Sequence, residues 1–148
     1  MHSATELELI VGGMLKGALD AEGFDDITQC IHDASEVFTD AETAILDFEK
    51  GDIDHVIDGV KQVGLMLQAV KSGMSDCSHI KADWERLAQM AAIFASPASF
   101  AYHVGKDLLI NGKDIFHEIN TAVADYKAGQ WEDFGINVGE AAAKVILG

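Results

Sequence analysis

Two stretches, AILDFEKGDIDHVIDGV at 44–60 and AVADYKAGQWEDFGINV at 122–138, carry the same pattern of residues 78 positions apart. In each stretch an apolar stripe with helical spacing runs up to a glycine, and a second stripe begins directly after it. We therefore predict a long helix, a glycine stop and a shorter helix, used twice as an internal repeat over about 23–72 and 101–147. The identical positions are Phe38 and Phe116, Thr43 and Thr121, Ala44 and Ala122, Asp47 and Asp125, Gly51 and Gly129, and Val60 and Val138.

The repeat has a simple alternative explanation. Any two amphipathic helical hairpins align when their apolar stripes are placed in phase, although the glycine and aspartate matches lie outside those stripes. In either case one hairpin cannot bury its own apolar face, and a second hairpin of the same kind can cover it. The pattern predicts two helical pairs packed against each other.

The composition predicts a single all-α domain over 1–148. The chain has 148 residues, 49% of them hydrophobic, and one proline, so it can bury one core and favours helix nearly throughout. We expect a bundle of five or six helices. Their predicted bounds are about Thr5–Leu19, Asp25–Lys50, Asp52–Gly73, Ser75 or Asp76 to the ASPAS segment around Pro97, Pro97–Ala128 with a kink or interruption at Asn111–Gly112, and Trp131 to the C-terminus.

The charge of the chain excludes two classes of partner. With 25 acidic and 10 basic residues the net charge is −15, which repels nucleic acid and anionic membrane surfaces. No apolar run reaches the length of a membrane span. The first residues lack the pattern of a signal peptide, which indicates a cytoplasmic protein if this start is native. The letters MHS are also typical of a recombinant start that replaces a removed signal, which leaves a secreted or vesicular location open.

Cys30 and Cys77 fit neither a zinc site nor a CxxC redox motif, because they lie far apart and outside any Cys/His cluster. Cys30 falls on an apolar stripe and Cys77 near the start of the fourth predicted helix. One structural disulfide or two buried thiols are both consistent with this spacing.

Glycines inside the predicted helices indicate close helix packing. A glycine within a helix costs about 1 kcal/mol relative to alanine, so another interaction should offset that cost. Close packing within the chain, close contact between subunits and room for a flat ligand are the three alternatives. The residues assigned to helix packing or self-association are Gly13, Gly17, Gly59, Gly64, Gly135, Gly139 and Met14.

The aromatic residues gather in the second half of the chain. Core packing is the ordinary role of such residues, and an apolar ligand cavity between helices is the functional alternative. The candidates for lining such a cavity are Trp84, Phe94, Tyr102, Phe116, Tyr126, Trp131 and Phe134.

No motif predicts catalysis or a cofactor. Each internal histidine has an acid one helical turn away, as in di-metal bundles, but we expect these acids on solvated faces rather than inside the bundle. The chain has no serine nucleophile elbow, no Cys–His signature and no phosphate-binding glycine loop. We therefore predict no enzyme activity, no metal and no cofactor.

Three stretches and Cys77 resemble a poorly characterised family of small, secreted-type, two-cysteine helical proteins of ciliates and other single-celled eukaryotes. The stretches are DDITQCIHDASEVF, IFASPASFAYHVGKDLLINGKDIFHEI and AVADYKAGQWEDFGINVGEA, and the resemblance covers about Gly23 to Leu147. It implies a helical fold, a Cys30–Cys77 bond and an extracellular or vesicular location. It implies no catalytic residue.

We therefore expect a non-catalytic structural or interaction protein that self-associates outside the cell, as a homo-oligomer or larger assembly. The alternative is a carrier of a small apolar ligand or lipid in a cavity between helices.

Overall fold

The structure, a computed structural model, describes residues 2–22, 35–72, 81–94 and 96–147, and within these ranges it is all α-helix without a strand. The prediction of an all-α fold is confirmed. The helices are α1 (Ala4–Leu19), α3 (Ser35–Lys50), α4 (Ile53–Ser72), α5 (Trp84–Ile93), α6 (Pro97–Lys127) and α7 (Trp131–Leu147).

Polar side chains cap the starts of α1 and α6. Ser3 caps α1 by accepting from the Glu6 N–H, and the Glu6 carboxylate accepts from the Ser3 N–H in return. Ser96 caps α6, and the first helical residue after it is proline, whose fixed φ suits that position. These caps satisfy N–H groups that have no partner within the helix.

Both predicted hairpins are present, and each turns at the predicted glycine. Gly51 joins α3 to α4 with φ 77°, and Gly129 joins α6 to α7 with φ 75°. These left-handed values are open to glycine without a steric cost. The second helix is the shorter one in α6–α7, with 17 residues against 31. In the first hairpin the predicted start of the long helix at Asp25 lies outside the described residues, so the relative lengths of α3 and α4 stay untested. The internal repeat over 23–72 and 101–147 stays a prediction.

The fourth helix begins later than predicted. Asp83 caps α5 by accepting from the Arg86 N–H at 2.9 Å, so the helix starts at Trp84. Residues 81–83 are not helical; instead the Glu22 N–H donates to the Lys81 carbonyl and the Asp83 N–H donates to the Leu19 carbonyl. The predicted starts at Ser75 and Asp76 lie outside the described residues.

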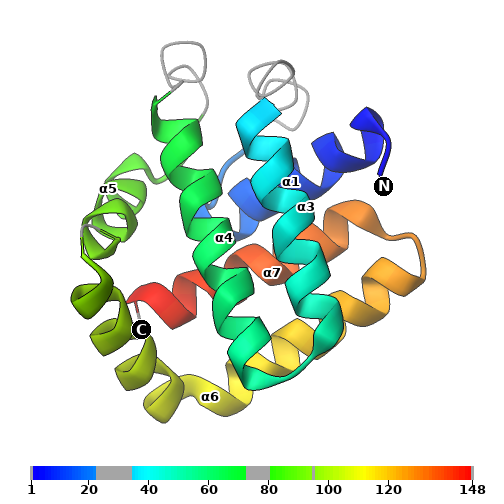
Figure 1. Ribbon diagram of the computed structural model, residues 1–148. Coiled ribbons are helices and arrows are strands. Elements are labelled where there is room, and N and C mark those ends of the chain that lie inside the picture. Colours follow the sequence, from blue (N-terminus) through cyan, green and yellow to red (C-terminus); the bar gives the residue numbers. More distant parts are fainter. Residues whose placement is uncertain (1, 23–34, 73–80, 95, 148) are drawn as a thin grey trace.

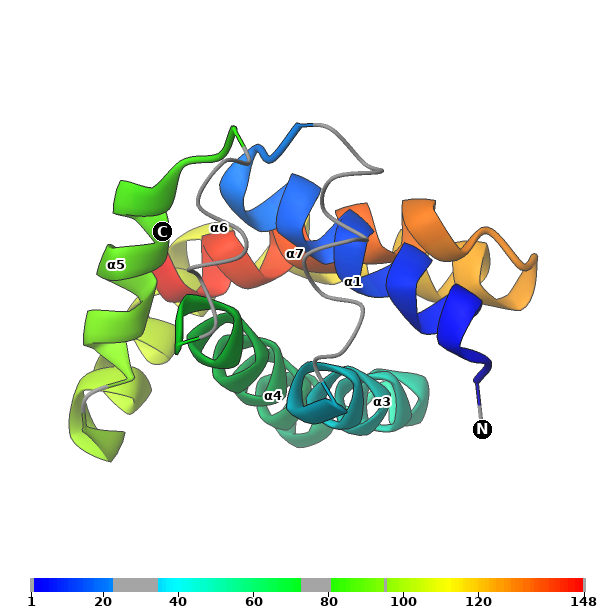
Figure 2. The same ribbon diagram turned by 90° about the horizontal axis from the view of Figure 1, so that it is seen from above.

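The helices form two layers. Figure 1 shows α3 and α4 side by side in front of α7, and Figure 2 shows the same pair as one layer against a second layer of α1 and α7. Helix α6 packs along the far side of α7, and α5 closes one end.

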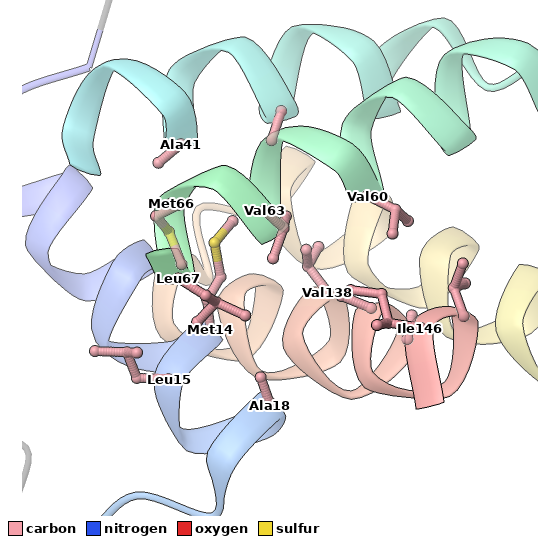
Figure 3. Close-up of a cluster of buried hydrophobic side chains, with 14 of the residues drawn as sticks. Met14, Leu15, Ala18, Ala41, Val60, Val63, Met66, Leu67, Val138 and Ile146 are labelled. Carbon is pink, nitrogen blue, oxygen red and sulfur yellow. The ribbon is translucent and has the colours of Figure 1, made fainter. Parts of the chain in front are cut away.

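The core lies between the two layers. Figure 3 shows Met14 of α1 and Val138 of α7 facing Val63 and Met66 of α4, and all four side chains are buried. The predicted stripe of α4 is buried except at Ile53, which lies exposed at the start of the helix. The apolar spacing of Ile53, Val56, Val60, Val63, Leu67 and Val70 predicts that Ile53 points inward, and this is wrong, since half of its surface is exposed at the first position of the helix.

Helix α6 is continuous over its 31 residues, so the predicted interruption at Asn111–Gly112 is absent. Figure 1 shows that the helix changes direction along its length, with its first part beside α5 and its later part beneath α7. A helix of this length kept straight would span about 46 Å. The bend keeps both parts of α6 in contact with the bundle.

Candidate functional site

Helices α1 and α7 cross with their backbones in contact. A Cβ added to Gly13 would meet the Glu132 carbonyl oxygen and lie 3.0 Å from the Gly135 Cα. A Cβ on Gly17 would meet the Ile136 carbonyl oxygen, and one on Gly139 would meet the Met14 carbonyl oxygen. Such an approach permits Cα–H···O contacts between helices, which offset part of the cost of the glycines. Lys16 and Glu132 add an ion pair at 2.7 Å beside the crossing.

Two glycines of α4 make room for aromatic rings. A Cβ on Gly59 would meet the ring of Phe48, and a Cβ on Gly64 would meet the ring of Phe94. Met14, assigned with the glycines to packing or self-association, is fully buried in the core. All seven of these residues are therefore used inside one chain, and contact with a second copy would need a different surface.

The seven aromatic candidates do not line one cavity. Tyr126, Trp131 and Phe134 form one cluster near the α6–α7 turn, with ring centroids 5.2–5.3 Å apart. Phe94 stacks on Phe100 at 5.0 Å, next to α4. Of the remaining candidates, Trp84 and Phe116 are half-buried on α5 and α6, where both pack against the core, and Tyr102 is exposed.

His2 has a role that was not predicted from the sequence. Its Nε2 lies 2.7 Å from the Tyr126 hydroxyl, and its backbone N–H donates to Glu42 Oε1 at 3.1 Å. Its ring also meets Trp131 edge to face, with centroids 5.7 Å apart. His2 therefore links α3, α6 and α7. The sequence around His2 carries no pattern that predicts this role.

Asp107 of α6 is buried, with 2% of its surface exposed, although all histidine-neighbouring acids were expected on solvated faces. That expectation is wrong for Asp107, which lies one helical turn after the buried Val104 on the same side of α6. Among the described residues, its Oδ2 has no hydrogen-bond partner. Burial raises the pKa of the Asp107 carboxyl, and the charges of Lys106 and His103 act in the opposite direction.

We predict that Asp107→Asn stabilises the protein at neutral pH. The pKa of the Asp107 carboxyl is raised in the folded state. The carboxyl therefore contributes fully to the stability at pH values below 3.8, the pKa in the unfolded chain, and this contribution is lost as the pH rises through the pKa in the folded state. Removing the charge should therefore raise the free energy of unfolding relative to wild type, by an amount that grows between about pH 4 and pH 7 and reaches about 1 kcal/mol or more. Urea unfolding of both proteins across this pH range measures the difference.

Asp58→Asn, on the exposed side of α4, is the matched control for this change and should alter the free energy of unfolding by less than about 0.5 kcal/mol at any pH. A pH-independent difference between wild type and Asp107→Asn would contradict the prediction.

Two further acids, Glu118 of α6 and Glu140 of α7, lie near Lys144. Lys144 donates to Glu118, and the other oxygen of Glu118 has no hydrogen-bond partner within the part of the chain that the structure describes. Burial, then the Glu118 charge, raises the pKa of Glu140. These acids face one lysine and do not gather into a metal site. In the part of the chain that the structure describes, no three His, Cys, Asp or Glu residues are placed to hold a metal ion.

One side of α6 carries large apolar residues that are mostly exposed. Leu109 is 88% exposed, Tyr102 67% and Ile110 66%. Lys106 and Lys113 are exposed beside them, and each of the five residues lies three or four positions from another of them, so they share one side of the helix. We call these five residues the α6 outer face.

An open groove of about 500 Å³ lies between the start of α3 and the end of α4. Its α4 side carries Leu65 and Ala69, and its α3 side carries Glu36 and Asp40. Burial, then the Glu36 charge, raises the pKa of Asp40. We call this hollow the α3–α4 groove; its other lining residues are Ser35, Thr39 and Gln68.

Two further predictions concern the cysteines and membrane-spanning helices. Cys30 and Cys77 lie outside the described residues, so the choice between a disulfide and two thiols is unchanged. Among the helices described, none combines the length and the apolarity needed to cross a membrane.

The family model described as SctB-like, secreted protein B-like, matches residues 2–147. The chain therefore belongs to the SctB-like family, whose description favours a secreted protein. That description includes neither ciliates nor paired cysteines, so these parts of the resemblance stay predictions. Comparisons with curated proteins and with solved structures gave no match.

Proposed function

We propose that this member of the SctB-like family is a secreted, non-catalytic protein that self-associates through the α6 outer face. The observation that carries the proposal is the exposure of Tyr102, Leu109 and Ile110 on one side of one helix. A contiguous apolar patch on a soluble protein often marks an interaction site. The description of the family supports the secreted setting.

Energetics support contact at this face. Burying one leucine or isoleucine side chain contributes about 1.5–3 kcal/mol, and the face offers two of them and a tyrosine. The interface of a single helix face is small compared with those of stable complexes, so we expect a weak association, with a Kd on the order of 10–100 μM. The net charge of −15 opposes non-specific aggregation, so association should be confined to defined contacts.

The carrier hypothesis receives less support from the described residues. It requires aromatic side chains around one apolar space, whereas Phe134 is in the core, Phe94 fills the space beside Gly64 and Tyr102 faces solvent. Self-association is therefore the function that we propose.

Leu109→Asp is expected to prevent self-association. A carboxylate at the centre of the α6 outer face removes the apolar contact and places a charge where it would lose water, so the Kd should rise at least about tenfold. Sedimentation velocity from about 10 μM to about 1 mM measures this, because the wild-type sedimentation coefficient should increase with concentration and that of the variant should not.

Leu46→Asp is the matched control for this experiment, since Leu46 is 62% exposed on α3 and lies outside the α6 outer face. It should associate as the wild type does. Wild-type protein that stays monomeric over the whole range, or two variants that behave alike, would count against the proposed function.

A further inference from the structure

The α6 outer face and the α3–α4 groove differ in charge. The face places Lys106 and Lys113 beside its apolar residues, in a chain that has only 10 basic residues against 25 acidic ones. The groove places Glu36 and Asp40 beside apolar residues that include Leu65. The face thus carries two lysines with Asp114 at its edge, one helical turn after Ile110, so that its net charge is positive, whereas the groove carries two carboxylates.

We infer that the α6 outer face of one copy docks into the α3–α4 groove of a second copy of this chain. This inference rests on the proposed function and adds the surface that receives the face. The apolar residues of the face would contact Leu65 and Ala69, and the two lysines would lie against the two carboxylates of the groove.

The electrostatics of the groove favour a cationic partner. Glu36 and Asp40 are one helical turn apart and repel each other, which contributes to the raised pKa of Asp40. A lysine ammonium placed between them relieves this repulsion. An acidic helix face in the same position would increase the repulsion between the carboxylates. The α6 outer face carries lysines and is therefore suited to bind in this groove, although the chain as a whole is acidic.

The two surfaces lie at different ends of the molecule. Figure 1 shows the start of α3 and the end of α4 at the top, and the first half of α6 at the lower left. A chain therefore cannot fill its own groove with its own α6 outer face. Contact between two different surfaces is heterologous, so each added copy offers a new free groove, and the assembly grows into a ring or a filament.

Two complementary variants test this arrangement. Leu109→Asp blocks the face and keeps the groove, whereas Glu36→Lys combined with Asp40→Lys reverses the groove and keeps the face. Each variant alone should be monomeric by sedimentation velocity. An equimolar mixture should form a complex of two chains that grows no further, because one intact face meets one intact groove.

Asp54→Lys combined with Asp58→Lys is the matched control, with the same change of charge at exposed positions of α4 outside the groove. It should associate like the wild type. If the doubly reversed groove variant loses its helical circular dichroism, Leu65→Asp on the α4 side of the groove replaces it in the same mixture.

The outcomes separate this inference from the proposed function. A groove variant that associates as strongly as the wild type, while Leu109→Asp does not, overturns the groove as the receiving surface and leaves self-association standing, with the face pairing with itself. A wild type that stays monomeric overturns both. A two-chain complex that appears only in the mixture supports the head-to-tail contact.

Discussion

Gly17→Ala is expected to destabilise the protein by about 3 kcal/mol, near the upper end of the cost of overpacking a core. The added methyl group would meet the Ile136 carbonyl oxygen and lie 2.9 Å from the Glu140 backbone nitrogen. Both are backbone atoms of α7, so no side chain can rotate away and the two helices must separate. Urea unfolding followed by circular dichroism, at a low protein concentration, measures the loss.

Gly112→Ala is the matched control for Gly17→Ala. An added Cβ at Gly112 of α6 meets no atom within 4 Å, so alanine gains helix propensity without a clash. It should stabilise the protein by up to about 1 kcal/mol. The same substitution therefore has opposite signs at the two positions. Equal effects at Gly17 and Gly112 would contradict the close α1–α7 crossing.

Phe134→Ala is expected to cost about 3–5 kcal/mol of stability, the range found when a buried aromatic ring is truncated. Phe134 is 1% exposed, and its ring centroid lies 5.2 Å from that of Tyr126. The substitution leaves a cavity beneath α7 that the surrounding helices cannot fill. Chemical unfolding of variant and wild type measures the difference.

Leu46→Ala is the control for loss of apolar volume at the surface and should change stability by less than about 0.5 kcal/mol. If Phe134→Ala were equally mild, Phe134 would line an open cavity, as the carrier hypothesis requires, rather than fill the core.

Local patterns predicted most of the helices. Both hairpins were predicted from the apolar spacing and from Gly51 and Gly129. This was possible because helical periodicity and the left-handed turn depend on residues that are close in the sequence. The same reasoning placed the start of the fourth helix too early. Asp83 is one helical turn after His79 in the sequence and was counted among the acids beside histidines, whereas in the structure it caps α5.

The candidate site was less predictable, because it depends on contacts between distant segments. The glycine spacing indicated close packing, but the pairing of Gly13 and Gly17 with α7 follows only from the crossing of the two helices. The burial of Asp107 and the exposure of Leu109 follow from how α6 packs on the bundle, which periodicity does not specify. His2 contacts Tyr126 across most of the chain length.

The head-to-tail contact is tested most directly by zero-length carbodiimide cross-linking, which joins a lysine amine to a carboxylate that touches it. A mixture of ¹⁴N- and ¹⁵N-labelled wild-type chains distinguishes links between copies from links within one copy. We expect mixed-isotope peptides that join Lys106 or Lys113 to Glu36 or Asp40. Mixed-isotope links confined to other acids, or none in a sample that associates, would contradict the contact between the α6 outer face and the α3–α4 groove.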